Sequence, residues 1–310
     1  MPDRVMTLYR PVLPVDVVQT LSPLMRGRRD PTCWMHPVSR DVWRTSHAFA
    51  GGATTVFRQA RDGVRIVSWG EAAEIAVDEA PVLLGRDDDW SELRLEALPE
   101  LADVRRRNEG LRLPKSGAVF EALSAAIIEQ KITGLEAHRA WDILHRDYAG
   151  AAPGPAGLVP RHLRLPLTPE QWRRIPSWDW HRAGVDHSRT GTVIRSATVA
   201  SALERTASLP TGSEEPLRRL RSIVGVGVWT ANETVQRSHG DPDAPSFSDY
   251  HIPNMVGWAL AGCDVDDDGM RELLEPWRGH RERVVRLIKL AGNPRPKHGA
   301  RMTVQDHRFH

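Results

Sequence analysis

The chain has 310 residues, with 42 Lys or Arg against 40 Asp or Glu and a formal net charge of +2. That length accommodates two domains with separate cores, and a composition of 40% hydrophobic and 26% charged residues is ordinary for a globular protein. Cys33 and Cys263 stand far apart, which excludes a four-cysteine zinc site or a cysteine-held iron–sulfur cluster within this sequence. No apolar run approaches about 18 residues and the N-terminal stretch lacks an apolar signal core, so we expect a cytoplasmic protein with no membrane partner.

Charge is distributed unevenly along the chain. The segment from Arg271 to His310 holds ten Lys or Arg against four Asp or Glu, so residues 1–270 carry a net negative charge. A basic segment is the footprint expected of a protein that binds a polyanion such as nucleic acid. A solvated basic face without a partner explains the same charge equally well.

Residues 1–109 are expected to form an antiparallel β domain with helices. Three runs rich in branched and aromatic residues, VWRTSHAFA, TTVFRQA and VRIVSWG, are typical of strands. Gly51-Gly52 separates the first two runs, and Asp62-Gly63 is a hairpin signal between the second and the third. A helix is expected around Val15–Leu24, and the acidic stretch from Arg86 to Leu93 is expected to open another helical segment.

The pattern becomes helical from residue 110 to residue 291. VFEALSAAIIEQKI carries apolar residues at helical spacing, and LEAHRAWDILHRDYAG continues as an amphipathic helix that Gly150 ends. Further helices are expected at Pro169–Arg174, Ser188–Thr206, Glu215–Ile223, Trp229–Ser238, Pro253–Ala261, Asp268–Leu274 and Gly279–Leu290. The predicted fold class is therefore α+β: a small N-terminal antiparallel sheet domain, a larger all-α domain, and a basic tail at 292–310.

The stretch LRSIVGVGVWTAN, Leu220 to Asn232, places two glycines inside a helical, apolar pattern. A dinucleotide-binding loop is a poor interpretation, because Thr230 stands where that motif has its third glycine and because a helix precedes it instead of a strand. We predict a helix, a tight turn at Gly225 and Gly227, and a second helix from Trp229. Such a turn leaves backbone N–H groups open to a phosphate. The other interpretation is a glycine-tightened packing turn between helices.

Asp249 follows 24 residues after Gly225, in the run SFSDYHIPN. A carboxylate that faces a deoxyribose stabilises the positive charge that develops when an N-glycosidic bond breaks, and it can activate the attacking water. The other interpretation is a helix N-cap, since Asp is a favoured cap and a helix is expected to begin near Ile252.

Four blocks in this order resemble the helix-hairpin-helix DNA glycosylases, in particular the branch of 3-methyladenine DNA glycosylase II (AlkA-like). They are GLRLPKSGAVFEALSAAIIEQKI, LRSIVGVGVWTAN, SFSDYHIPN and EPWRGHRERVVRLI. The resemblance covers about residues 110–290, a little over half of the chain. It implies a helix-hairpin-helix glycosylase domain, a catalytic role for Asp249, and contacts to DNA from the hairpin residues Gly225, Val226, Gly227 and Thr230.

The resemblance also indicates the type of reaction. Bifunctional members of the superfamily form a Schiff base with the sugar through a Lys two residues after the second hairpin glycine. That position is Trp229 here, which cannot form an imine, so we expect a monofunctional glycosylase without lyase activity. No cofactor and no divalent metal are expected, while the hairpin carbonyls of Ile223 and Val226 are candidates for a monovalent cation.

An enzyme of this class flips the damaged base out of the duplex, which requires a plug for the gap. The resemblance places Gln130 in the family's motif and the intercalating position at Lys131, where the branch usually has an apolar wedge. Three interpretations stay open. Lys131 fills the gap with its aliphatic stem, Ile132 is the wedge, or Lys131 is a surface lysine at a helix end.

The flipped base also requires a pocket, and aromatic faces suit cationic alkylated purines through cation–π contact. The candidates are Trp229, Trp178, Trp277, Glu233 and Arg286. Glu233 stands where the branch has a Tyr, and Arg286 stands at about the position of its Trp. Glu233 is therefore expected to bond a purine edge or to pair with Arg286, although most of the tryptophans have the alternative role of core residues.

The leading hypothesis is a monomeric glycosylase that excises alkylated purines of the 3-methyladenine and 7-methylguanine type from double-stranded DNA. A glycosylase for deaminated or oxidised bases is an alternative, because the pocket positions depart from the branch. A catalytically silent protein that binds damaged DNA is another alternative, and it would share the hairpin and the basic tail but would not need Asp249.

Overall fold

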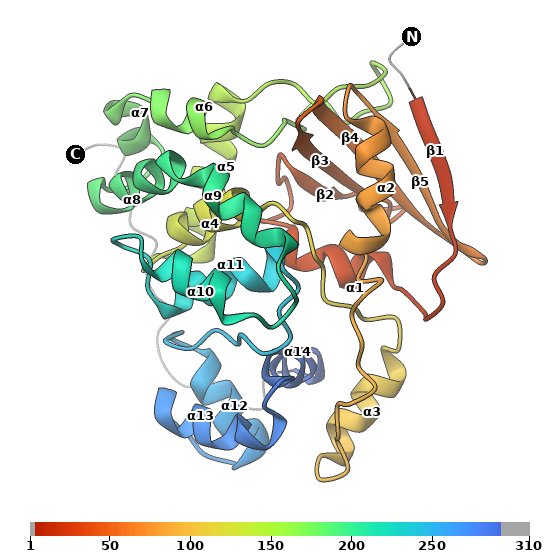
Figure 1. The fold of residues 1–310 in the computed structure, drawn as a ribbon, viewed down its shortest axis with the longest axis vertical. Coiled ribbons are helices and arrows are strands. Elements are labelled where there is room, and N and C mark those ends of the chain that lie inside the picture. Colours follow the sequence, from red (N-terminus) through yellow and green to blue (C-terminus); the bar gives the residue numbers. More distant parts are fainter. Residues whose placement is uncertain (1–3, 293–310) are drawn as a thin grey trace.

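The computed structural model describes residues 4–292, and its N-terminal part is a five-stranded antiparallel sheet. In space the strands follow the order β1-β5-β4-β3-β2 (Figure 1). Their bounds are β1 Arg4–Tyr9, β2 Cys33–Met35, β3 Val42–Ala48, β4 Gly51–Ala60 and β5 Gly63–Trp69. The predicted hairpin at Asp62-Gly63 is confirmed, since Ala60 pairs with Gly63 across the turn.

Helices α1 (Val17–Leu21) and α2 (Ala73–Leu83) cover one face of this sheet (Figure 1). The short 3-10 helix η1 (Ser22–Leu24) continues α1. Side chains of the two helices bury a core with β3, β4 and β5, in which Leu21, Phe57 and Ile66 are fully buried. Burial of each such side chain contributes roughly 1.5–3 kcal/mol, so the sheet is stabilised mainly through this face.

The rest of the described chain is helical, which confirms the predicted α+β class. The helices are α3 Pro99–Arg107, α4 Val119–Ile128, α5 Gly134–Tyr148, α6 Pro169–Arg174, α7 Ser177–Arg182, α8 His187–Thr198, α9 Ala200–Glu204, α10 Glu214–Arg221, α11 Val228–Ser238, α12 Ile252–Leu260, α13 Asp267–Leu274 and α14 Arg281–Ala291, with 3-10 helices η2 Arg205–Ser208 and η3 Glu275–Trp277. Helix α4 is the centre of this part: nine of its ten residues are buried, and it packs against α8 and α11.

The sequence pattern missed two elements near the N-terminus. Strand β1 was not expected because its residues RVMTLY are mostly exposed or half-buried at the edge of the sheet and show no clean alternation. Helix α2 was not expected because Pro81 stands inside it. Both elements form because they pack on the same hydrophobic core as β4 and β5.

Two helix expectations were wrong. Arg86–Leu93 forms turns, and α3 begins only at Pro99, because the Asp89 carboxylate accepts the N–H of Ser91 (2.8 Å) and so competes with helical bonding. The expected helix Ser188–Thr206 breaks at Val199, which has φ −113° and ψ 9°.

The packing joins segments on either side of residue 110. Leu101 and Val104 of α3 share a core with α12, α13 and α14, and Leu163 packs against Trp43 and Trp69 of the sheet. Apolar contacts therefore cross residue 110 in two separate places, one at α3 and one at the sheet. Within residues 4–292 no helix is both long enough and apolar enough to cross a membrane.

A buried ion pair also joins the two parts. Arg44 of β3 donates through both terminal nitrogens to the two carboxylate oxygens of Glu121 on α4, at 2.6 and 2.7 Å. The side chains are only 6% and 11% exposed. Burial alone would raise the pKa of Glu121, but the charge and hydrogen bonds of Arg44 outweigh it and hold that pKa below its ordinary value of 4.5.

We predict that Glu121→Ala destabilises the protein by about 3–5 kcal/mol, because it leaves the Arg44 guanidinium buried and unpaired. Urea unfolding measures this loss, and Asp87→Ala, which breaks an exposed pair with Arg86, should leave the midpoint nearly unchanged. Because the folded pKa of Glu121 is lowered, its contribution is complete above pH 4.5 and is lost as pH falls through the folded pKa. Equal midpoints for the two variants would contradict this role for the pair.

Candidate nucleic-acid interface and active site

Helices α10 and α11 form the predicted helix–turn–helix. Gly225 has φ +98°, a left-handed conformation that glycine adopts without strain, and the N–H of Val226 closes the turn on the Ile223 carbonyl at 3.0 Å. Gly227 is the N-cap of α11, no side chain of the described residues caps this end, and the space where a Gly227 side chain would stand is open. The first N–H groups of an 11-residue helix are thus left for an anion.

Two side chains from outside α10 and α11 donate hydrogen bonds to backbone carbonyls of the turn. Gln130, which follows α4, donates through Nε2 to the Gly225 carbonyl at 3.0 Å and to the Thr230 hydroxyl at 2.8 Å. Arg195 of α8 donates through Nε to the Val224 carbonyl at 3.1 Å. The structure therefore joins the predicted residues Gln130 and Thr230 to the hairpin. The role of Arg195 was not predicted, since no local signal links it to a turn 29 residues away.

The segment after Gln130 adopts an unusual backbone conformation. Lys131 is exposed and has φ +57°, in the left-handed region that few residues other than glycine occupy. Ile132 is half-buried and packs against the core around α4 and α5. Of the two predicted wedge positions, only Lys131 is thus available at the surface. Such strained conformations are concentrated at functional sites, which favours a role for this residue.

Asp249 is held on both oxygens by groups that donate hydrogen bonds. Its Oδ1 accepts the backbone N–H groups of His251 (2.7 Å) and Ile252 (3.0 Å), at the start of α12. Its Oδ2 accepts the indole N–H of Trp229 at 2.9 Å. The side chain therefore bonds the start of the helix, as the alternative interpretation expected, and at the same time contacts the residue that follows the hairpin. The carboxylate is half-buried and so still reaches solvent.

The residue before Asp249 fixes the direction of this loop. Ser248 has φ +65°, and both its N–H and its hydroxyl bond the carboxylate of Asp267, at 2.7 and 2.9 Å. Tyr250 is 83% exposed and lies beside the exposed His251. Asp249 is thus presented from a loop that is anchored on both sides.

Glu233 lies one helical turn beyond Trp229 on α11, but it does not pair with Arg286, so that expectation was wrong. It pairs with Arg237 at 2.6 Å and accepts a hydrogen bond from Ser246. Burial raises the pKa of Glu233, and the charges of Arg237 and Lys289 outweigh this effect and lower the pKa overall. Arg237 is the nearer partner because it stands four residues away on the same helix.

One of the pocket candidates lies apart from Asp249 and the hairpin. Trp178 is 70% exposed on α7, which lies at the opposite end of the helical part from α12 and α14 (Figure 1). Trp277 donates its indole N–H to the Arg94 carbonyl at 2.6 Å and packs against a core that Val228 and Ile252 also contact. The fold therefore separates Trp178 from the other candidates.

The described part of the basic C-terminal segment is largely paired. Ion pairs join Arg278 to Glu275, Arg281 to Asp243, and Arg283 to Asp88. Positive charge at the start of α14 is thus mostly neutralised by neighbouring carboxylates. The predicted basic tail falls almost entirely at positions 293–310, outside the described residues.

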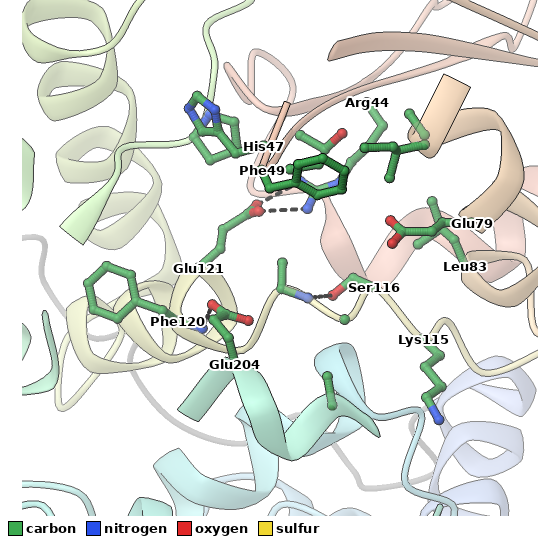
Figure 2. Close-up of a pocket in the computed structure, with 18 of the residues that line it drawn as sticks. Arg44, His47, Phe49, Glu79, Leu83, Lys115, Ser116, Phe120, Glu121 and Glu204 are labelled. Atoms are coloured by element: carbon green, nitrogen blue, oxygen red, sulfur yellow. Dashed lines mark hydrogen bonds and ion pairs between the residues drawn. The ribbon is translucent and has the colours of Figure 1, made fainter. Parts of the chain in front are cut away.

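A cleft of about 760 Å³ lies elsewhere, between the sheet, α2 and the start of α4 (Figure 2). Glu79 from α2 and Glu204 from α9 stand on opposite sides of it, and burial raises the pKa of both carboxyl groups. None of the residues predicted from the sequence lines this cleft. Lys115 lines the cleft as well, so its charges are of both signs.

The hairpin carbonyls proposed as ligands of a cation are partly engaged in hydrogen bonds within the turn. The Ile223 carbonyl accepts the Val226 N–H but keeps a second lone pair, so it remains able to bind an ion. A set of neutral carbonyls without a carboxylate fits a weakly held monovalent cation better than a divalent one. Among residues 4–292 no group of three or more His, Cys, Asp or Glu could hold a metal ion.

Comparison with solved structures gives a consistent result. A 3-methyladenine DNA glycosylase from Archaeoglobus fulgidus aligns over 93% of this chain and 98% of its own, with a TM-score of 0.75 and 17% identity. MBOgg1 in complex with a low-affinity DNA ligand aligns with a TM-score of 0.72 and 13% identity, over 93% and 95% of the two chains. The apo form of the 8-oxoguanine glycosylase/lyase of Clostridium acetobutylicum gives 0.70 and 15%, over 94% and 97%. No protein-family model and no curated protein matches the chain.

The protein has the fold of the helix-hairpin-helix DNA glycosylases. The alignments span both the sheet and the helices, so the likeness extends well beyond the helical blocks on which the sequence resemblance rested.

The two hairpin glycines should respond differently to a methyl group. Gly225→Ala should lower the unfolding midpoint, because alanine is strained at φ +98° and its Cβ would overlap the Thr192 side chain. Gly227→Ala should leave the midpoint nearly unchanged, since its φ of −91° is ordinary and the space is open. Thermal unfolding of both variants tests this contrast, and equal destabilisation would show that Gly227 is also a packing residue.

Proposed function

We propose that this protein is a monofunctional DNA glycosylase of base excision repair, which acts as a monomer in the cytoplasm without a cofactor. Its substrates are alkylated purines of the 3-methyladenine and 7-methylguanine type in duplex DNA. The observation that carries the proposal is the position of the Asp249 carboxylate. It accepts a hydrogen bond from Trp229, in the first turn of α11, and the N–H groups at the start of this helix, after Gly227, have no side-chain cap. The solved glycosylases with this fold support the same class of reaction.

The hairpin is the proposed site for the DNA backbone. The N–H groups of Gly227 and the first turn of α11 would bind a phosphate, and this contact positions DNA without reading its sequence, whereas the Val226 N–H is already used within the turn. Gln130 and Thr230 keep the turn in shape, and they also keep the Gly225 carbonyl away from the phosphate. Lys131 would enter the gap left by the flipped base, with its aliphatic stem between bases and its ammonium near phosphate.

Asp249 is the proposed catalytic residue. The C1′–N bond breaks with its electron pair going to the base, and positive charge develops on the deoxyribose. The carboxylate stabilises that charge, and it takes a proton from the water whose oxygen adds to C1′. The three hydrogen bonds that Asp249 accepts hold the carboxylate in one orientation, which this chemistry requires.

Trp229 has two proposed roles. Its indole N–H fixes the Asp249 carboxylate, and its ring offers an aromatic face to a cationic base. It occupies the position from which a lysine would form a Schiff base, so the enzyme should release the base and leave the strand intact.

We predict that Asp249→Asn lowers single-turnover release of methylated purines by about 100-fold or more. An asparagine oxygen can still accept the N–H groups of His251 and Ile252, but its amide nitrogen faces the Trp229 indole N–H, so DNA affinity should be retained and the thermal midpoint should fall slightly. Alkali-labile sites in a methylated duplex measure the release. Asp16→Asn, which alters a side-chain cap on α1, is the matched control and should keep full activity.

Full activity in Asp249→Asn would contradict the site assignment. No release by the wild type over a panel of alkylated, deaminated and oxidised bases would favour the silent DNA-binding protein instead. Borohydride added during turnover should trap no covalent adduct, and an adduct would show that the enzyme uses lyase chemistry.

A further inference from the structure

An arginine in the last turn of α8 lies beside the hairpin and is held there by two hydrogen bonds. Arg195 donates through Nε to the Val224 carbonyl at 3.1 Å and through Nη2 to the Thr192 hydroxyl at 2.9 Å. Thr192 is 1% exposed, and its own hydroxyl donates to the Ser188 carbonyl at 2.9 Å. The guanidinium group is therefore attached to a buried residue on one side and to the turn on the other.

The sequence of α8 makes room for this group. Glycine in the interior of a helix is unfavourable relative to alanine, yet Gly191 stands one helical turn before Arg195. A Cβ atom at Gly191 would lie only 3.1 Å from Nη1 of Arg195. The absence of a side chain at this position thus lets the guanidinium group lie close to α8 while it reaches the turn.

Much of the hydrogen-bonding capacity of Arg195 remains unused. A guanidinium group has five N–H donors, and two of its nitrogens bond Val224 and Thr192 through one N–H each. Arg195 is exposed, and within residues 4–292 no carboxylate pairs with it. The remaining N–H groups and a full positive charge are therefore available to an anion at the surface.

We propose that Arg195 binds the DNA phosphate next to the one that lies at the start of α11, so that the hairpin region holds two neighbouring phosphates of one strand. The inference rests on the proposed function, because it assumes that the hairpin binds the DNA backbone. Val224 and Gly227 are three residues apart, a span of at most about 10 Å, so both contacts belong to one small surface. The Val224 side chain is 74% exposed, so this side of the turn faces solvent.

A guanidinium group fixed in this way suits a phosphate. Its planar arrangement of N–H groups donates two parallel hydrogen bonds to phosphate oxygens, and such charge-assisted bonds are stronger than neutral ones. Because two bonds already hold Arg195, little side-chain freedom is lost when DNA binds. A phosphate contact carries no sequence information, so Arg195 should strengthen binding to damaged and undamaged duplexes alike.

A purely structural role, in which Arg195 only supports the turn, makes a different prediction, and one substitution separates the two. The Nε2 of glutamine stands at the same place along the side chain as the Nε of arginine. Arg195→Gln therefore keeps a donor for the Val224 carbonyl but removes the charge and the outer N–H groups. Arg195→Lys keeps the charge. The matched control is Arg65→Gln, which removes the same charge from an exposed position on β5, in the sheet and away from α10 and α11 (Figure 1).

The test measures the affinity of the full-length protein for an undamaged duplex by fluorescence anisotropy, between about 50 and 200 mM salt. The slope of log affinity against log salt concentration reports how many phosphates the protein neutralises. Arg195→Gln should make this slope shallower by about 0.9 and should weaken binding roughly five- to tenfold at about 0.1 M salt. Its thermal midpoint should be retained. Arg195→Lys should keep most of the slope, and Arg65→Gln should change neither the slope nor the affinity.

A slope in Arg195→Gln equal to that of the wild type would overturn the inference and leave Arg195 as a support of the turn. Equal losses in Arg195→Gln and Arg195→Lys would also overturn it, because the charge would then not be the cause. An unfolded fraction lowers the apparent affinity at every salt concentration alike, so the slope remains a test even if a variant loses stability. Failure of the proposed function has another signature: the wild type would bind duplexes but release no base from methylated DNA.

Discussion

The hydrogen bond from the Trp229 indole to the Asp249 carboxylate is the interaction on which the proposed site depends. Trp229 belongs to the first turn of α11, and the same helix begins at Gly227, where its N–H groups are open. A rigid helix end thus sets the distance between a phosphate-binding turn and a carboxylate. The second carboxylate oxygen is held by the start of α12, so the acid cannot rotate away from the site without losing three hydrogen bonds. Positioning of this kind lowers the barrier only if the groups are fixed before the substrate arrives.

Charge is used differently at the two ends of α11. At its N-terminus the helix dipole and the unpaired N–H groups attract an anion. Lys131 is exposed there and directly follows Gln130, which bonds the Gly225 carbonyl. Farther along the helix, Glu233 and Arg237 neutralise each other, and most of the described arginines of the C-terminal segment pair with carboxylates. The number of Lys and Arg residues in the sequence therefore overstated how much unpaired positive charge the described part of the chain presents. The proposed contact with DNA rests on a local backbone feature more than on net charge.

Local signals predicted those features whose cause is local. Thr168 and Pro169 are a cap and a first-turn residue, and α6 has the predicted bounds Pro169–Arg174. The glycines at 225 and 227 predicted the turn, although only Gly225, with φ +98°, adopts a conformation that other residues rarely take. The partners of these residues could not be predicted in the same way: Gln130 reaches Gly225 across 95 positions, and Arg195 reaches Val224 across 29. Glu233 pairs with Arg237 one turn away on its own helix, whereas Trp277 bonds the Arg94 carbonyl, a neighbour that only tertiary packing brings near. The roles assigned to the site residues stay predictions.

The most direct measurement is a crystal structure of Asp249→Asn bound to a duplex that carries 7-methylguanine. The account predicts that a phosphate accepts hydrogen bonds from the N–H groups at Gly227 and the start of α11, that the C1′ atom of the flipped nucleotide contacts residue 249, and that Lys131 lies in the gap. A duplex bound at another face of the protein, or a flipped sugar remote from residue 249, would contradict the central claim that this hairpin and this carboxylate form one active site.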